Sequence, residues 1–329
     1  KFFLIAYFIL NILTMFTIQT AVTIVTAGLA SSLFGFTDNM VIWSLIITVS
    51  CYLILLVGKY NLLDRMIKII ILILAISTII STGVASLNTS ETYTFEQVFP
   101  TDAGLVFLVA FMGWMPAPLD ISIWHSIWAI EKTKTHKITK KDSLFDFNVG
   151  YIGTVFLGIC FVSLGTLVMY NSGISFSSSG SVFAGQLIEL YTSNLGDNLY
   201  LIISICAFTT MLSTTITTLD ASPRTMSRAT QLLTKNSNKN YYFHWISILA
   251  IGTMLIFYFL LSEMGALVEI ATVLSFITAP FYAILNYKLV TSKNMPDQHK
   301  PSKLLRILSV SGILFLSFFA LGYILSRFI

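Results

Sequence analysis

The sequence predicts an all-α, polytopic membrane protein with nine transmembrane helices. Hydrophobic residues make up 56% of the 329 residues and charged residues only 10%, whereas soluble domains carry about 25% charged residues. A surface so poor in charge would aggregate in water, so we expect the chain to be dissolved in lipid. The same composition excludes a disordered chain, a nucleic-acid-binding protein and a disulfide-stapled secreted module.

Nine charge-poor stretches are long enough to cross a bilayer core, which takes about 20 residues in a helix. None alternates polar and apolar residues as the strands of a membrane barrel do. The first is too long for one straight span, so we expect its end, residues 30–39, to be a loop. The nine stretches are residues 2–34, 40–57, 67–86, 104–130, 148–170, 198–219, 244–261, 264–287 and 305–325.

The positive charges test this number of spans. If Lys1 is cytoplasmic, every lysine and arginine except Arg327 falls in a cytoplasmic segment, as the positive-inside rule requires. The long outer loops, residues 87–103 and 171–197, contain no lysine or arginine. A wrong number of spans would have scrambled this alternation. An Ile-, Lys- and Asn-rich composition without organelle signals favours a bacterial inner membrane.

Nothing in the sequence resembles a catalytic domain or a cofactor site. We find no Walker loop, no Gly-x-Gly-x-x-Gly after a strand, no His-Glu-x-x-His and no Gly-x-Ser-x-Gly motif. Cys51, Cys160 and Cys206 lie in apolar runs without a Cys-x-x-Cys pair, so we interpret them as small core residues. We therefore expect neither an enzyme nor a resident cofactor. A chain with many spans and little outside the membrane is most often a transporter or a channel.

The fourth stretch, residues 104–130, contains Pro116 and Pro118 in its middle. Each proline lacks an amide donor and clashes with the preceding turn, so a continuous helix is not expected there. At 1.5 Å per residue, the helix from Gly104 to Trp114 is about 16 Å long, roughly half a bilayer core. The break of Pro116, Ala117 and Pro118 therefore lies near the midplane, where unwound backbone persists only beside a cavity or a ligand.

Two side chains make this break a candidate cation site. The outer half-helix directs its C-terminal carbonyls, including that of Met112, toward the break, and this partial negative end suits a cation. Met115 lies on the unwound stretch, and Asp120 follows within one turn; a carboxylate at this depth is expensive and indicates function. The alternatives are a gap-filling methionine and an acid stabilised by the dipole of the second half-helix.

Residues 113–120, Gly-Trp-Met-Pro-Ala-Pro-Leu-Asp, resemble the broken sixth helix of the Nramp family of divalent metal transporters, whose motif is Met-Pro-His-Asn. Met115 and Pro116 match it directly, Ala117 replaces the histidine, Pro118 replaces the asparagine, and Asp120 has no counterpart. The resemblance implies a LeuT-like fold of two inverted five-helix repeats and proton-linked uptake of manganese or iron. The missing His-Asn pair indicates a divergent branch.

The resemblance also implies how the chain is divided. The basic segment 58–68 resembles the family's link between its fourth and fifth helices. Residues 1–86 then form the rest of a first repeat, residues 104–290 a second repeat and residues 305–329 an extra helix. Since the first repeat needs two more helices, we expect 60–90 further residues upstream in the parent gene, at roughly 20 residues per span plus links. The family's aspartate ligand would lie there.

Other residues are weaker candidates for binding the ion or for carrying protons. A thioether is a soft ligand that adds nothing for magnesium or calcium, so Met115 favours manganese, iron or another first-row ion. The family has a glutamine eight residues before a proline of its tenth helix; the matching position before Pro280 is Thr272. His125 could carry protons because histidine titrates near neutrality, as could Glu269. A packed neutral histidine and a solvated helix start are the alternatives.

We interpret the small polar residues in the span 198–219 as contacts between packed helices. We expect Asp220 to pair with Arg224, one turn on. The hydroxyl residues of this span are Thr209, Thr210, Ser213, Thr214, Thr215, Thr217 and Thr218.

Two other functions remain open. One is a LeuT-like transporter of an amino acid or another small organic solute, which needs small residues at the break, where Trp114, Met115 and Asp120 are bulky. The other is a non-transporting remnant or assembly partner. The expected partners are thus a divalent metal ion, a proton and the lipid bilayer, and no pattern indicates an oligomeric state.

Overall fold

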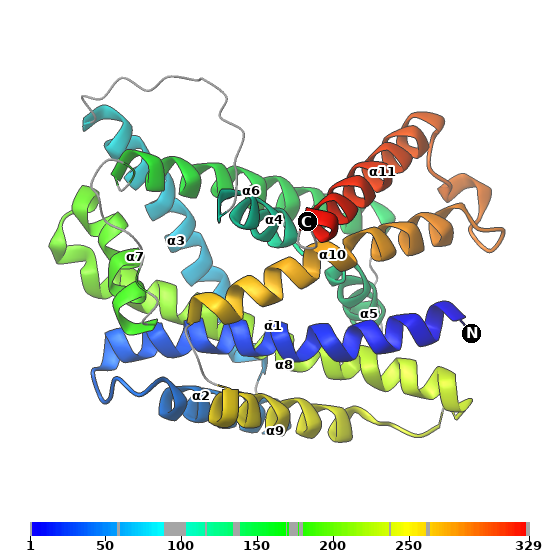
Figure 1. The fold of residues 1–329 in the computed structure, drawn as a ribbon, viewed down its shortest axis with the longest axis horizontal. Coiled ribbons are helices and arrows are strands. Elements are labelled where there is room, and N and C mark those ends of the chain that lie inside the picture. Colours follow the sequence, from blue (N-terminus) through cyan, green and yellow to red (C-terminus); the bar gives the residue numbers. More distant parts are fainter. Residues whose placement is uncertain are drawn as a thin grey trace. The chain divides into compact units, whose positions relative to one another are not determined.

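The computed structural model describes residues 2–57, 60–88, 103–115, 117–133, 139–168, 170, 177, 180–236, 238–260 and 264–326. All regular structure in these segments is helical (Figure 1). Eight of the helices are long and apolar enough to cross a membrane, and two apolar helices are shorter. The chain is therefore a multi-pass membrane protein. Lys1 and Lys59, at the start of the basic segment 58–68, lie outside the described residues.

The helices, in chain order, are α1 (Phe2–Phe34), α2 (Met40–Val57), α3 (Tyr60–Asn88), α4 (Ala103–Trp114), α5 (Ile121–Thr133), α6 (Lys140–Val168), α7 (Gly180–Leu195), α8 (Tyr200–Thr234), α9 (Tyr242–Leu260), α10 (Met264–Thr291) and α11 (Lys303–Ser326).

The chain forms two compact units. Unit 1 is made of Lys1–Gln97 and Lys132–Val268, and so contains α1–α3 and α6–α9. Unit 2 is made of Val98–Glu131 and Glu269–Ile329, and so contains α4, nearly all of α5 and of α10, and α11. Each unit is built from segments far apart in the sequence.

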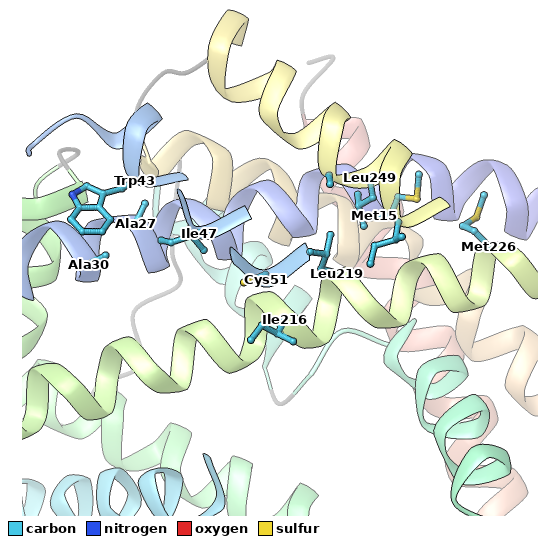
Figure 2. Packing of buried hydrophobic residues seen from close by; sticks show 12 residues of the cluster. Met15, Ala27, Ala30, Trp43, Ile47, Cys51, Ile216, Leu219, Met226 and Leu249 are labelled. Atoms are coloured by element: carbon cyan, nitrogen blue, oxygen red, sulfur yellow. The ribbon is translucent and has the colours of Figure 1, made fainter. Parts of the chain in front are cut away.

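The core of unit 1 forms where α1 and α8 run side by side, with α2 and α9 packed against them (Figure 1). Figure 2 shows this core from close by: Met15 of α1, Ile47 of α2 and Leu219 of α8 belong to one apolar cluster with Leu249 of α9. All four side chains are buried. Because these side chains pack together, helices α1, α2, α8 and α9 share one apolar core.

A polar seam crosses the same α1–α8 contact. Gln19, fully buried, donates from Nε2 to Thr23 Oγ1 (3.2 Å) and to the Thr215 carbonyl (3.4 Å). Its Oε1 accepts from Thr218 Oγ1 (2.7 Å). The hydroxyls of Thr26 and Thr215 lie 2.8 Å apart. The packing interpretation is therefore confirmed for Thr215 and Thr218, since each hydroxyl bonds across the two helices.

Replacing Gln19 by leucine should lower the thermal stability of the protein in detergent by about 1 kcal/mol, because interhelical hydrogen bonds in a membrane contribute modestly. Thr17→Val is the matched control, since the Thr17 hydroxyl donates only to carbonyls of its own helix among the bonds seen here. Equal melting temperatures for Gln19→Leu and wild type would show that the seam contributes nothing.

The end of α1 differs from the expectation. The loop predicted for residues 30–39 begins only at Gly35, because α1 stays helical through Phe34. Ala27 and Ala30 pack into the unit 1 core, which keeps this last part of the helix ordered. Gly35 ends it with φ +61°, a conformation that glycine adopts without strain.

α8 extends beyond its predicted span, and α7 lies in a segment predicted to be a loop. α8 continues past Leu219 to Thr234, because this added part is bonded to a neighbouring helix: Asn11 Nδ2 donates to Thr225 Oγ1 (3.2 Å). The predicted outer loop 171–197 contains α7. Ile188 and Tyr191 of α7 are buried, and the Tyr191 hydroxyl lies 3.1 Å from that of Thr78 in α3. Tertiary contacts therefore stabilise a helix too short to span a membrane.

The predicted ion pair of Asp220 is confirmed. Arg224 Nε donates to Asp220 Oδ2 (2.6 Å), and the Tyr242 hydroxyl donates to Asp220 Oδ1 (2.6 Å). The Arg224 guanidinium also lies over the Tyr242 ring, 5.0 Å from its centroid. Both oxygens of this buried carboxylate are thus satisfied, and α8 is tied to α9.

Candidate ion-binding site

The fourth predicted span is two helices, as expected from its prolines. α4 ends at Trp114 and α5 begins at Ile121. With 12 and 13 residues, they are about 18 and 20 Å long, so each crosses little more than half of a bilayer core. Pro116 lies outside the described residues, whereas Ala117 and Pro118 lie in the non-helical link.

The sequence of the link leaves carbonyls of α4 without their helical donors. The amide of Met115 donates to the Phe111 carbonyl (2.8 Å), which closes the last turn. In a continuous helix the Met112 carbonyl would accept from the amide of residue 116, and the Trp114 carbonyl from the amide of residue 118. Both of these residues are prolines, which carry no N–H. Unpaired carbonyl groups in an apolar environment need another partner, and a cation is one that also suits the negative end of a helix.

The two methionines have different surroundings. The side chain of Met112 packs on the apolar cluster of unit 2, which contains Val109, Phe276, Ala320 and Tyr323. Its thioether is thereby used in packing, and its carbonyl is the group that points along the helix axis toward the break. Met115 is half-buried and lies beyond the last residue of α4.

Asp120 is 4% exposed and directly precedes α5. An ordinary capping carboxylate accepts hydrogen bonds from the second or third amide of its helix. Here those amides are occupied by backbone, because Ser122 N donates to the Leu119 carbonyl (3.3 Å) and Ile123 N to the Asp120 carbonyl (3.0 Å). Within the described part of the chain, Asp120 Oδ1 accepts no hydrogen bond. The carboxylate therefore has an acceptor to offer to a ligand.

α10 contacts the end of α4. An added Cβ on Gly113 would come within 2.0 Å of the Thr272 carbonyl oxygen, so the two backbones touch at this point. Next to it, Trp114 Nε1 donates to Ser275 Oγ (3.0 Å). The Thr272 hydroxyl itself donates to the Glu269 carbonyl (2.9 Å). Thr272 is thus near the end of α4, but its backbone makes the contact.

α10 also contacts the start of α5. Asn286 Nδ2 donates to Ser122 Oγ (2.9 Å), and Ser122 Oγ donates to the Leu119 carbonyl (2.7 Å). The predicted site residues did not include Gly113, Ser275 or Asn286. An amide side chain inside an apolar span was a signal that could have drawn attention to Asn286.

Comparisons with known proteins agree with the local resemblance. Residues 1–326 match the model of the Nramp family, described as natural resistance-associated macrophage protein-like. The chain belongs to the Nramp family. It is also 32% identical over 335 residues to an uncharacterized protein of Pasteurella multocida (strain Pm70), covering 98% of this chain and 76% of the relative.

Nramp proteins are transporters of divalent metal ions, usually with protons, and not enzymes. Membership therefore makes metal-ion transport the general function of this chain. No group of three or more His, Cys, Asp and Glu residues that could hold a metal occurs in the described segments.

The two proton-pathway candidates, His125 and Glu269, are exposed, whereas Asp120 is buried. His125 is exposed on α5, and its ring lies edge-on to that of Trp128. Glu269 is exposed near the start of α10. Their roles in carrying protons stay predictions.

Proposed function

We propose that this Nramp protein is a secondary transporter of a divalent transition-metal ion, manganese- or iron-like, that binds at the break between α4 and α5. The observation that carries the proposal is the buried carboxylate of Asp120, whose Oδ1 accepts no hydrogen bond in the described segments. A charged carboxylate in that state is expensive to bury unless it binds a cation or takes up a proton.

The ligands differ in chemistry, and together they favour a transition metal. Asp120 and the carbonyls of Met112 and Trp114 supply hard oxygen atoms, and Met115 supplies a soft sulfur. Magnesium and calcium gain nothing from the sulfur, whereas first-row transition ions accept mixed ligands. Thr272 is a further candidate on α10, beside the end of α4.

The wider proposal follows the family. The chain adopts a LeuT-like fold with inverted repeats, in which residues 104–290 form the second repeat and α4–α5 its interrupted helix. Uptake is coupled to protons, with His125 and Glu269 as candidate carriers. The protein lies in a bacterial inner membrane with Lys1 on the cytoplasmic side, an orientation supported by the distribution of lysine and arginine.

Changing Met115 to leucine should reduce manganese or iron uptake by about tenfold, a loss of roughly 1.4 kcal/mol. Any calcium uptake should fall much less, because a thioether contributes little to calcium. The measurement is initial uptake into proteoliposomes over a range of ion concentrations.

Met112→Leu is the matched control, because it removes the same sulfur from a side chain that packs on the unit 2 cluster and keeps the volume nearly constant. Its uptake should stay close to wild type. Equal losses in Met112→Leu and Met115→Leu, or equal losses for manganese and calcium, would count against a thioether ligand.

A further inference from the structure

Both halves of the broken helix are fastened to the same neighbour, α10. On the α4 side, the contacts are Trp114 Nε1 to Ser275 Oγ at 3.0 Å and the backbone contact of Gly113 with Thr272. On the α5 side, the contact is Asn286 Nδ2 to Ser122 Oγ at 2.9 Å. We call these contacts the α4 clip and the α5 clip.

The clips lie at the two edges of the break. Gly113 and Trp114 are the last residues of α4, and Ser122 is the second residue of α5. Ser275 and Asn286 are separated by about 16 Å along α10, at 1.5 Å per residue. α10 stays helical through Pro280, which lies between these two residues, so one helix bridges the non-helical link from one side to the other.

Apolar packing strengthens the connection on the α4 side. Phe276 of α10 is fully buried and belongs to one cluster with Val109 of α4 and with Ala320 and Tyr323 of α11. The compact unit 2 likewise joins Val98–Glu131 with Glu269–Ile329, although 137 residues separate the two segments in the chain. On the α5 side, the connection to α10 is the polar contact between Ser122 and Asn286.

We propose that α10 is a splint that carries α4 and α5 as one body, with Ser275 and Asn286 as positioning residues for the ion site. The inference rests on the proposed function only in its effect on transport. The splint holds the end of α4, with Met115 just beyond it, at a set separation from Asp120 at the start of α5. When the transporter changes the side on which its site is open, α4, α5 and α10 move together.

Removing the α5 clip should make the separation between the end of α4 and the start of α5 more variable without unfolding the protein. In Asn286→Ala, the KM for manganese should rise about fivefold, the effect of one lost hydrogen bond, while the maximal rate stays close to wild type. Ser122→Ala removes the same bond from the other partner. If the two residues act through one clip, the double variant should be no worse than either single variant.

Variants of Asn286 that keep or remove its N–H donor show whether the hydrogen bond, and not only the packing of the side chain, is needed. The Ser122 hydroxyl already donates to the Leu119 carbonyl, so it needs a donor from α10. Asn286→Gln keeps an N–H donor and should restore a low KM, whereas Asn286→Asp removes the donor and should not. Thr278→Val is the matched control on α10, because the Thr278 hydroxyl donates to the Leu274 and Ser275 carbonyls of its own helix.

A distance measurement tests the splint independently of transport. Spin labels at Phe107 on α4 and Ile130 on α5 occupy exposed positions, and Cys51, Cys160 and Cys206 are buried and react poorly with the label. Pulsed EPR should give a narrow distance distribution in the wild type and in Thr278→Val, and a broader one in Asn286→Ala and Ser122→Ala.

The outcomes separate the two proposals. If the wild type takes up metal but neither the distances nor the KM change in Asn286→Ala and Ser122→Ala, the splint is wrong and the proposed function stands. If the wild type takes up no metal but the distances broaden in both variants, the splint stands without the transport proposal. Unchanged distances in both variants overturn the splint in either case.

Discussion

Replacing Gly113 by alanine should abolish metal uptake and lower the stability of the protein by about 3 kcal/mol. The new Cβ would lie 2.0 Å from the Thr272 carbonyl oxygen and 2.9 Å from its carbon. Both atoms belong to the backbone of α10, so no side chain can rotate away, and the two helices must separate. Overpacking typically costs about 1–3 kcal/mol and occasionally more.

Two other glycines provide controls for this prediction. Gly312 in α11 has nothing within 4 Å of an added Cβ, so Gly312→Ala should be neutral or slightly stabilising because alanine favours a helix. Gly252 in α9 meets the edge of the Phe16 ring at 2.3 Å, and a ring can shift more easily than a backbone. A Gly113→Ala variant as stable and active as Gly312→Ala would show that α4 and α10 are not in this contact.

Changing Asp120 to asparagine should have opposite effects on transport and on stability. Uptake of manganese or iron should fall by more than about tenfold, since the only charged ligand proposed at the break is lost. The melting temperature should stay constant or rise, because the variant no longer buries a charge whose Oδ1 accepts no hydrogen bond in the described segments. Uptake assays and thermal unfolding in detergent measure the two effects.

Asp220 is the natural comparison, as another buried aspartate with both oxygens bonded. Asp220→Asn should lower the melting temperature, because it removes the charge that pairs with Arg224 and weakens the hydrogen bond from Tyr242. If Asp120→Asn instead lowers stability as much as Asp220→Asn and leaves uptake intact, Asp120 is a structural carboxylate.

The break was predictable because its cause is local. Pro116 and Pro118 together remove two amide donors from a single turn, and α4 ends just before them. A lone proline is tolerated in this protein, since Pro223 and Pro280 lie inside α8 and α10. The apolar spans were predictable for a similar reason, since the cost of burying charge in lipid depends on composition. The family resemblance could also be read from the eight residues 113–120.

Other features depend on partners far away in the sequence. Trp114 and Ser275 are 161 residues apart, and Ser122 and Asn286 are 164 residues apart, so neither clip leaves a local pattern. The end of α1 was expected to be a loop because length alone was considered, yet Ala30 is buried in the unit 1 core. α7 is stabilised by contacts of Tyr191 and its neighbours and has no span-like hydropathy.

Thr272 illustrates the same limit within the site. Counting from Pro280 placed a weak oxygen ligand at this position, because the family resemblance concerns side chains. The contact that the structure adds is between the backbones of Thr272 and Gly113. It depends on the absence of a side chain at Gly113, which has meaning only once α4 and α10 are packed together.

The most direct measurement of the central claim is the set of atoms that coordinate the bound metal. X-ray absorption spectroscopy at the iron K edge, on the purified protein loaded with Fe(II), reports whether sulfur lies among the nearest neighbours of the ion. We predict a sulfur scatterer in the wild type and in Met112→Leu, and its loss in Met115→Leu. A first shell without sulfur in the wild type, or a sulfur scatterer that persists in Met115→Leu, would contradict binding of the ion by Met115 at the break.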